Sequence, residues 1–226
     1  MKFKAIAVDI DGTITSMNRS LDIIAVESLR SLKIPVVLAT GNTLCYTHAA
    51  ARLIGVEGIV IAENGGIVST GFDTLPIVSE YIKDCDKAFQ LLSGKFELTK
   101  LDSEYRKTEI VLRRDFDVEI ARKILYENEL NVEIIDTHFA IHIKSKYINK
   151  GTGLIKVAEL MGLDPKDFVA IGDSVNDIEM LKVAGFSIAV GNADDDLKNM
   201  ADFVSDYSYG AGTAESINYL RKNDLI

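Results

Sequence analysis

The chain has 226 residues, 47% of them hydrophobic, and its 25 basic and 34 acidic residues give a formal net charge of −9. This length can bury a sizeable core in one large domain, or in one domain with an insert. The negative charge disfavours nonspecific nucleic-acid binding, because the phosphate backbone repels an acidic protein. From the apolar runs and the N-terminal residues we expect neither a membrane span nor a signal peptide.

The cysteine content fits a reducing compartment. Two cysteines are too few for a disulfide framework or a zinc cluster, so Cys45 and Cys85 are expected to be reduced thiols. The expected location is therefore the cytoplasm.

Strands and helices alternate in the first part of the chain. Residues 3–8, 36–39 and 58–62 have the apolar character of buried strands. A helix capped by Ser20 is predicted between the first two strands, and a second helix ends near Ile54. This alternation predicts a parallel sheet with helices on its faces.

The middle of the chain has a different pattern, in which a helix is followed by two strands, and the pattern occurs twice. Strands that follow one another without a helix predict antiparallel pairing and a separate small α+β unit. The expected elements are helices over 83–92 and 117–128 and strands over 96–100, 108–112, 132–135 and 140–144.

The first pattern returns after residue 150. The expected elements are helices over 153–161 and 174–183, strands over 168–171, 186–190 and 203–204, and a last helix from about Thr213. We therefore predict an α/β fold, a Rossmann-like parallel sheet with an inserted α+β domain. Residues 1–82 and 149–226 form the predicted core, and residues 83–148 form the predicted insert.

The most informative stretch is Asp9-Ile10-Asp11-Gly12-Thr13, which follows the first predicted strand. A carboxylate at a strand end can attack phosphorus and form an aspartyl-phosphate, while a second carboxylate carries the proton. Asp-Gly is also a common turn dipeptide, so an ordinary turn is the alternative for this stretch alone.

Two further segments offer groups that bind phosphate. Thr40 supplies a hydroxyl, and Gly41 and Asn42 supply backbone N–H groups near a predicted helix N-terminus. A helix N-cap is the alternative for this segment. Lys150 offers a positive charge, for which a solvated surface lysine is the alternative.

A fourth segment offers ligands for a metal ion. Asp173 and Asp177 are four residues apart at a predicted helix start, so they can lie on one helix face. Clustered hard oxygens suit Mg²⁺, which binds one or two carboxylates together with water and phosphate oxygens. A carboxylate favoured by the helix dipole is the alternative. In an open α/β sheet, groups that follow the strands meet at one edge, so these four segments can converge.

Taken in this order, the four segments resemble the four motifs of haloacid-dehalogenase-superfamily phosphatases. The resemblance covers essentially the whole chain. The content of the insert and the turns at residues 63–66 and 191–193 resemble the Cof-like branch, which has a type IIB cap. The short cap and the length are most similar to archaeal phosphoglycolate phosphatases and sucrose-phosphatase-like hydrolases. One departure is Asn42, because many relatives carry arginine there.

The resemblance implies Mg²⁺-dependent hydrolysis of a small organic phosphate ester, with phosphoglycolate as the expected substrate. Asp9 is then the nucleophile. Asp11 protonates the leaving alkoxide and later activates water against the aspartyl-phosphate. Such an enzyme of carbohydrate metabolism needs a small-molecule substrate, and neither a nucleic acid nor a membrane as partner.

The same resemblance implies two sets of binding residues. The implied metal ligands are Asp9, the backbone carbonyl of Asp11, Asp173 and, directly or through water, Asp177. The residues implied to hold the phosphate are Thr40, Gly41, Asn42 and Lys150.

The insert is expected to select the substrate. The cations that could bind a carboxylate or a sugar acid are Arg106, Lys107, Arg113, Arg114 and Lys144. A solvated surface position is the favoured alternative for most of them. The histidines His48, His138 and His142 give little support for a zinc site. His142 alternates with isoleucines and is expected to face solvent or the helices of the insert.

Other functions fit parts of the pattern. A sugar-phosphate phosphatase and a phosphomutase would use the same groups. A noncatalytic sensor of phosphorylated metabolites would not need the complete set of acidic residues and Lys150. A dehalogenase is disfavoured, because Asp11 supplies an acid that halide departure does not require.

Overall fold

A computed structural model of the chain describes residues 2–136 and 140–226. The chain divides into two compact units, Met1–Pro76 with Asn149–Ile226 and Ile77–Ile148, called here the core unit and the insert unit. The insert unit begins at Ile77, whereas the sequence placed its start at residue 83. His138, one of the histidines considered above, lies outside the described residues.

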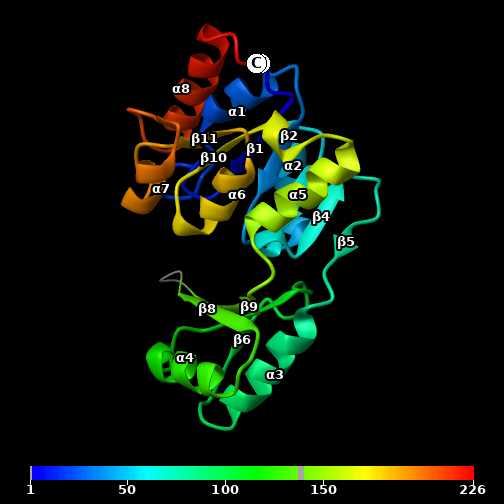
Figure 1. Cartoon of the computed structure of the whole chain (residues 1–226), viewed down its shortest axis with the longest axis vertical. Helices are drawn as coiled ribbons and strands as arrows, with labels where there is room; N and C mark the ends of the chain where they lie inside the picture. The colour runs from blue at the N-terminus through cyan, green and yellow to red at the C-terminus, as the bar shows by residue number, and fades with distance from the viewer. Residues whose placement is uncertain (1, 137–139) are drawn as a thin grey trace. The chain divides into compact units, whose positions relative to one another are not determined.

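The core unit contains a sheet whose strands run in the order β12-β11-β10-β1-β2-β3-β4 (Figure 1). All neighbouring pairs from β12 to β3 are parallel, and β4 is antiparallel to β3. The strands are β1 (Ala5–Asp9), β2 (Val36–Ala39), β3 (Ile59–Ala62), β4 (Ile67–Thr70), β10 (Phe168–Gly172), β11 (Phe186–Ala189) and β12 (Phe203–Val204). The parallel sheet and the short last strand confirm the prediction, whereas β4 was not predicted.

Helices cover both faces of this sheet, because successive residues of its buried strands point to opposite sides. Helices α1 (Ile23–Arg30), α2 (Leu44–Ile54) and α8 (Tyr209–Lys222) pack with Ile6 and Val8 of β1. Helices α5 (Lys150–Met161), α6 (Ile178–Val183) and α7 (Asp195–Met200) pack on the other face, with Ala5 and Ala7 of the same strand. The predicted α/β class is therefore confirmed.

Several helices begin elsewhere than predicted, among them α5 at Lys150 instead of 153 and α6 at Ile178 instead of 174. Helix α1 is capped by Asp22, whose carboxylate accepts from the N–H of Ile24 at 3.0 Å, and not by Ser20. The cause is a bridge between Thr15 and Leu21, which keeps the intervening residues in a turn. Helix α8 begins at Tyr209 rather than near 213, and α7 was not predicted at all.

The insert unit contains an antiparallel sheet in the order β6-β7-β9-β8. Helices α3 and α4 bury Cys85, Leu92 and Leu125 in a common core with the isoleucines of β9. The strands are β5 (Ile77–Val78), β6 (Lys100–Leu101), β7 (Glu109–Leu112), β8 (Val132–Asp136) and β9 (Ile141–Ser145), and the helices are α3 (Ile82–Ser93) and α4 (Val118–Glu127). Antiparallel pairing is confirmed, but the strand predicted over 96–100 is the two-residue β6.

The structure gives no sign of a membrane span. Within residues 2–136 and 140–226, no helix is both long and apolar enough to cross a bilayer.

Candidate active site

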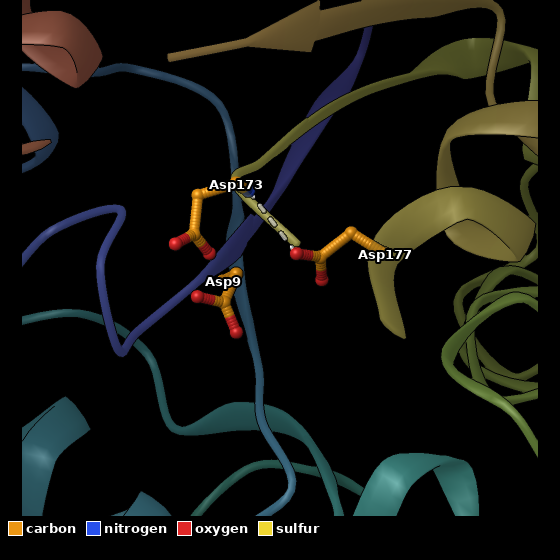
Figure 2. A group of neighbouring side chains, drawn as sticks. All are labelled: Asp9, Asp173 and Asp177. Atoms are coloured by element: carbon orange, nitrogen blue, oxygen red, sulfur yellow. Dashed lines mark hydrogen bonds between the residues drawn. The ribbon is translucent and has the colours of Figure 1, made fainter. Parts of the chain in front are cut away.

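The candidate active site lies at the carboxyl edge of the core sheet, where the strand order changes direction. Strand β1 leads to β2 and β3 on one side, while β10 leads to β11 and β12 on the other. Such a switch point is where open α/β sheets bind their ligands. Asp9 ends β1 and Asp173 follows β10, and these strands are neighbours. Figure 2 shows the side chains of Asp9, Asp173 and Asp177 gathered at one place, and each offers an oxygen within 4.8 Å of the other two.

The loop after β1 packs directly against Asp173. Gly12 has a φ of +91°, which is available to glycine at little cost, and a Cβ at this position would overlap the Asp173 carboxylate. The Thr13 hydroxyl donates to Asp173 Oδ1 at 3.3 Å. From the other side, the Asn192 amide donates to the Gly12 carbonyl at 3.0 Å. The glycine therefore allows the nucleophile loop and the acidic loop to touch.

Lys150 is buried at the centre of the site, so the alternative of a solvated surface lysine is wrong. It is the first residue of α5, which Asn149 caps by accepting from the N–H of Thr152 at 2.8 Å. The ammonium donates to Asp9 Oδ1 at 2.5 Å and to Asp177 Oδ1 at 2.6 Å, and the lysine is 3% exposed. The helix start thus places one cation between two carboxylates.

The position of Asn149 is fixed by the turn at residues 63–66. Gly65 has a φ of +104°, and a Cβ there would overlap the carbonyl oxygen of Asn149. This close approach requires glycine and leaves the start of α5 in one place.

Asp177 is held by the backbone of the loop in which it lies. Its Oδ2 atom accepts from the N–H of Asp173 at 3.1 Å (Figure 2) and from the N–H of Ser174 at the same distance. Asp177 closes a 3₁₀ turn, Val175–Asp177, and α6 begins only at Ile178. The expected shared helix face is therefore wrong, and the two aspartates are joined by the turn instead.

Burial and charge act together on the titration of these groups. Burial raises the pKa of Asp9 well above its ordinary value; Lys150 opposes this effect, while Asp177 and Asp173 add to it. Burial and the charge of Asp177 raise the pKa of Asp173 to about 7. For Lys150, burial acts to lower the pKa, but the charges of Asp177 and Asp9 outweigh it and raise the value.

The donor set fits a divalent cation. Asp9, Asp173 and Asp177 each offer an oxygen within 4.8 Å of the other two. Three carboxylates face one lysine, which leaves an excess of negative charge in a buried place. Asp9 Oδ2 is buried and has no hydrogen-bond partner among the described residues, so it has lone pairs to offer. Asp177 accepts a hydrogen bond from Lys150 at 2.6 Å and two from backbone N–H groups at 3.1 Å, whereas the Asp173 oxygens accept longer ones, at 3.3 and 3.5 Å, which favours Asp9 and Asp173 as direct ligands.

The segment after β2 contacts the second acid of the first motif. The Asn42 amide nitrogen donates to Asp11 Oδ2 at 2.8 Å. The Asn42 backbone N–H, which we expected to face phosphate, donates to Thr40 Oγ1 at 3.1 Å. Thr40 is 1% exposed, and Gly41 packs against the side chain of Asn64. Of this segment, Asn42 contacts the Asp11 carboxylate, and Thr40 contacts Asn42.

The insert cations fall into two groups. Arg106 and Lys144 are buried ion-pair partners of Glu109 and Glu133 respectively, not solvated surface residues. Arg114 is exposed and pairs with Asp136; Lys107 and Arg113 are also exposed. His142 is buried, with Nδ1 3.1 Å from Glu109 Oε2, so the expectation that it faces solvent or the helices is wrong.

Three residues near the site were given no role from the sequence, although Thr13 and Asn192 lie in stretches that the sequence singled out. Thr13 and Asn192 support the two loops, as described above. Tyr46, in the first turn of α2, has a pKa raised by burial and by the charges of Asp11 and Asp9. Its ring is therefore close to the two acids of the first motif. No pattern in the sequence indicated it.

Comparison with known proteins identifies the family. The family model described as haloacid dehalogenase-like hydrolase matches residues 6–109 and 99–217, most of the chain. The protein belongs to this family. The resemblance inferred from the four motifs is thereby confirmed.

Similar proteins span the full length of the chain. The phosphoglycolate phosphatase of Methanococcoides burtonii is 57% identical, with 100% of both chains covered. That of Archaeoglobus fulgidus is 48% identical, with 97% of both covered. A crystal structure from Thermoplasma acidophilum superposes with a TM-score of 0.88 at 26% identity, covering 100% of both chains. The sucrose-phosphatase of Synechocystis, at 17% identity and a TM-score of 0.75, shares the fold, covering 98% of this chain and 99% of its own.

Proposed function

We propose that this protein is a Mg²⁺-dependent phosphatase that hydrolyses 2-phosphoglycolate to glycolate and phosphate. The observation that carries the proposal is the buried group formed by Asp9, Lys150 and Asp173 at the switch point of the sheet. The choice of substrate is supported by full-length relatives named phosphoglycolate phosphatase, which are 55–57% identical to this chain.

In the first half-reaction, a carboxylate oxygen of Asp9 attacks phosphorus. A bond forms between this oxygen and phosphorus, and the bond between phosphorus and the ester oxygen breaks. Asp11 gives its proton to the departing oxygen, so glycolate leaves as an alcohol rather than an alkoxide. The products of this step are glycolate and the aspartyl-phosphate on Asp9.

In the second half-reaction, Asp11 acts as a base. It takes a proton from water, whose oxygen attacks phosphorus, and the bond between phosphorus and Asp9 breaks. Free phosphate leaves, and both carboxylates return to their starting states. One residue can serve both steps because it loses its proton in the first and regains it in the second.

Lys150 and Thr40 hold the transferring phosphoryl group in this scheme. The Lys150 ammonium is already hydrogen-bonded to Asp9, so a phosphoryl group bound to it lies next to the attacking carboxylate. The residues that would hold the metal are Asp9, Asp173 and the backbone carbonyl of Asp11, with Asp177 orienting Lys150 and the Asp173 loop. Mg²⁺ supplies positive charge, so that an anionic carboxylate can approach an anionic phosphate.

The test is phosphate release by the purified protein in MgCl₂ and in EDTA. The panel contains 2-phosphoglycolate, glucose 6-phosphate, AMP and p-nitrophenyl phosphate. We expect release only with Mg²⁺, and the highest kcat/KM for 2-phosphoglycolate. A higher kcat/KM for glucose 6-phosphate would contradict the assignment of 2-phosphoglycolate as substrate. Absence of phosphate release from every compound would contradict the assignment as a phosphatase. Product analysis by NMR distinguishes hydrolysis from transfer of the phosphoryl group to a second position.

A further inference from the structure

The carboxylate of Asp11 has a single hydrogen-bond partner among the described residues. That partner is the side-chain amide of Asn42, whose Nδ2 lies 2.8 Å from Asp11 Oδ2. A carboxylate can only accept, so the nitrogen of the amide, and not its oxygen, faces Asp11. The contact joins two loops 31 residues apart in the chain, one after β1 and one after β2.

The same amide also contacts Thr40. Its nitrogen lies 3.3 Å from Thr40 Oγ1, and the backbone N–H of Asn42 donates to that oxygen at 3.1 Å. An amide group has two hydrogens, so one can point to Asp11 and the other to Thr40. Because both lone pairs of Thr40 Oγ1 then accept hydrogen bonds from Asn42, the hydroxyl hydrogen of Thr40 is left to donate elsewhere.

The backbone of Asn42 is fixed on both sides. Its N–H donates to Thr40, and its carbonyl accepts from the N–H of Glu63 at 2.9 Å. Glu63 is fully buried in the turn that follows β3. The backbone position from which the Asn42 side chain extends is therefore fixed. A side chain with a fixed position can hold another side chain in one orientation.

We propose that Asn42 is a positioning residue that orients Asp11 for proton transfer, rather than a ligand of the substrate. Its N–H engages Oδ2 of Asp11 and so leaves Oδ1 to face the ester oxygen of the substrate. Its second hydrogen turns the Thr40 hydroxyl toward the phosphoryl group. This inference rests on the function proposed above, in which Asp11 is the acid and the base.

A positioning role predicts a dependence on the leaving group. An alkyl ester needs the proton of Asp11, because an alkoxide is a poor leaving group, whereas p-nitrophenolate leaves without protonation. The ratio kcat/KM covers the steps up to departure of the alcohol, so it reports the acid role alone. Loss of the Asn42 amide should therefore slow alkyl esters much more than aryl esters.

The experiment compares wild type, Asn42→Ala and Asn42→Asp on 2-phosphoglycolate and p-nitrophenyl phosphate. We expect kcat/KM for the alkyl ester to fall about tenfold to 100-fold, and that for the aryl ester to fall less than about threefold. With the aryl ester, both variants should also show a burst of p-nitrophenol, because Asp11 is needed as base in the second step. Asn42→Asp keeps the shape of the side chain but replaces the donor with a carboxylate that repels Asp11, so it should slow the alkyl ester at least as much as Asn42→Ala.

Cys45→Ser is the matched control. Cys45 is exposed in the first turn of α2, where its thiol lies 3.2 Å from the hydroxyl of Thr43. It should leave both kcat/KM values and the thermal midpoint unchanged. Thermal midpoints of the Asn42 variants show whether the fold is retained; if Asn42→Ala unfolds, Asn42→Asp carries the test.

Several outcomes decide against the inference. An equal fall for both esters, without a burst, would make Asn42 a phosphate-holding residue and overturn the positioning role. A rise in KM for 2-phosphoglycolate alone, with kcat unchanged, would make it a substrate contact. If the wild-type protein releases no phosphate from either ester, the proposed function fails, and that result is distinct from failure of the Asn42 proposal.

Discussion

Both units bury ionised side chains, but they balance the charges differently. In the core unit, Asp9 and Asp177 share Lys150, and Asp173 lies beside them. In the insert unit, Glu109 contacts two groups that can carry positive charge, Arg106 and His142.

This difference distinguishes a buried group that can bind a cation from a group of ion pairs that only stabilises the fold. A buried carboxylate with cationic partners is stabilised and has no demand for a further ion. A buried group with excess negative charge and a carboxylate oxygen without a hydrogen bond is costly until a cation binds. The Asp9 group has both of these features, so the imbalance marks the place where chemistry is expected.

The largest effect on activity should come from substitution of the proposed nucleophile in the Asp9 group. Asp9→Asn removes the attacking oxygen, so phosphate release should fall by at least about 10⁴-fold. The fold should persist, because asparagine has nearly the same shape as aspartate and its amide oxygen can still accept from Lys150. Circular dichroism and a phosphate-release assay measure the two properties. Wild-type activity in this variant would remove Asp9 from the mechanism.

A second substitution removes the cation from the same group. Lys150→Met leaves Asp9 and Asp177 without their shared partner, so unfolding should require about 3–5 kcal/mol less free energy in EDTA. Activity should fall by about 10²-fold or more, because the phosphoryl group loses a charge contact. Urea titration and steady-state kinetics test this. Full activity in a destabilised variant would show that Lys150 serves the fold alone.

The matched substitution in the balanced group is Glu109→Gln. It leaves Arg106 and His142 buried without their carboxylate. The free energy of unfolding should therefore fall by about 3 kcal/mol, similar to the decrease expected for Lys150→Met. The folded protein should still hydrolyse p-nitrophenyl phosphate at the wild-type kcat. If kcat falls with Glu109→Gln as far as with Lys150→Met, the distinction between the two groups is wrong.

The smallest effect concerns pH. The pKa of Asp173 is raised from 3.8 to about 7, so its proton is bound more tightly in the folded protein. Without metal, the stability linked to this group is present at low pH and lost as pH rises through this interval. Mg²⁺ binds the ionised form, so the rise in Tm on adding Mg²⁺ should grow from about pH 5.5 to about pH 7.5. A Tm increment independent of pH would exclude Asp173 as a ligand.

Much of the fold could be predicted because the buried strands of the core have continuous apolar runs. Irregular features escaped prediction for local reasons. Phe96 and Leu98 suggested a strand, yet they pack from a loop against the core of the insert unit. Gly210 and Gly212 disfavoured a helix in the sequence, yet both lie in the first turn of α8, where a Cβ would overlap the Asp22 side chain and the Tyr207 carbonyl oxygen respectively.

The candidate active site also contains features that could be predicted from the sequence and one that could not. Asp9, Lys150 and Asp173 were predicted because each follows a strand or begins a helix, and such positions meet at one edge of a parallel sheet. The contact of Asn42 with Asp11 could not be predicted, because it depends on how two loops turn after they leave the sheet. No periodic pattern encodes such a contact between side chains.

The close packing of Gly65 against Asn149 has a consequence for how such proteins diversify. Asn149 is the residue at which the chain returns to the core, and Lys150 follows at once. Because the turn at residues 63–66 fixes this point of return, the length and shape of the intervening segment can change in evolution without moving the lysine. The core unit can therefore keep its structure while the inserted segment changes. Residues 77–148 could be replaced by protein engineering if both junctions are retained.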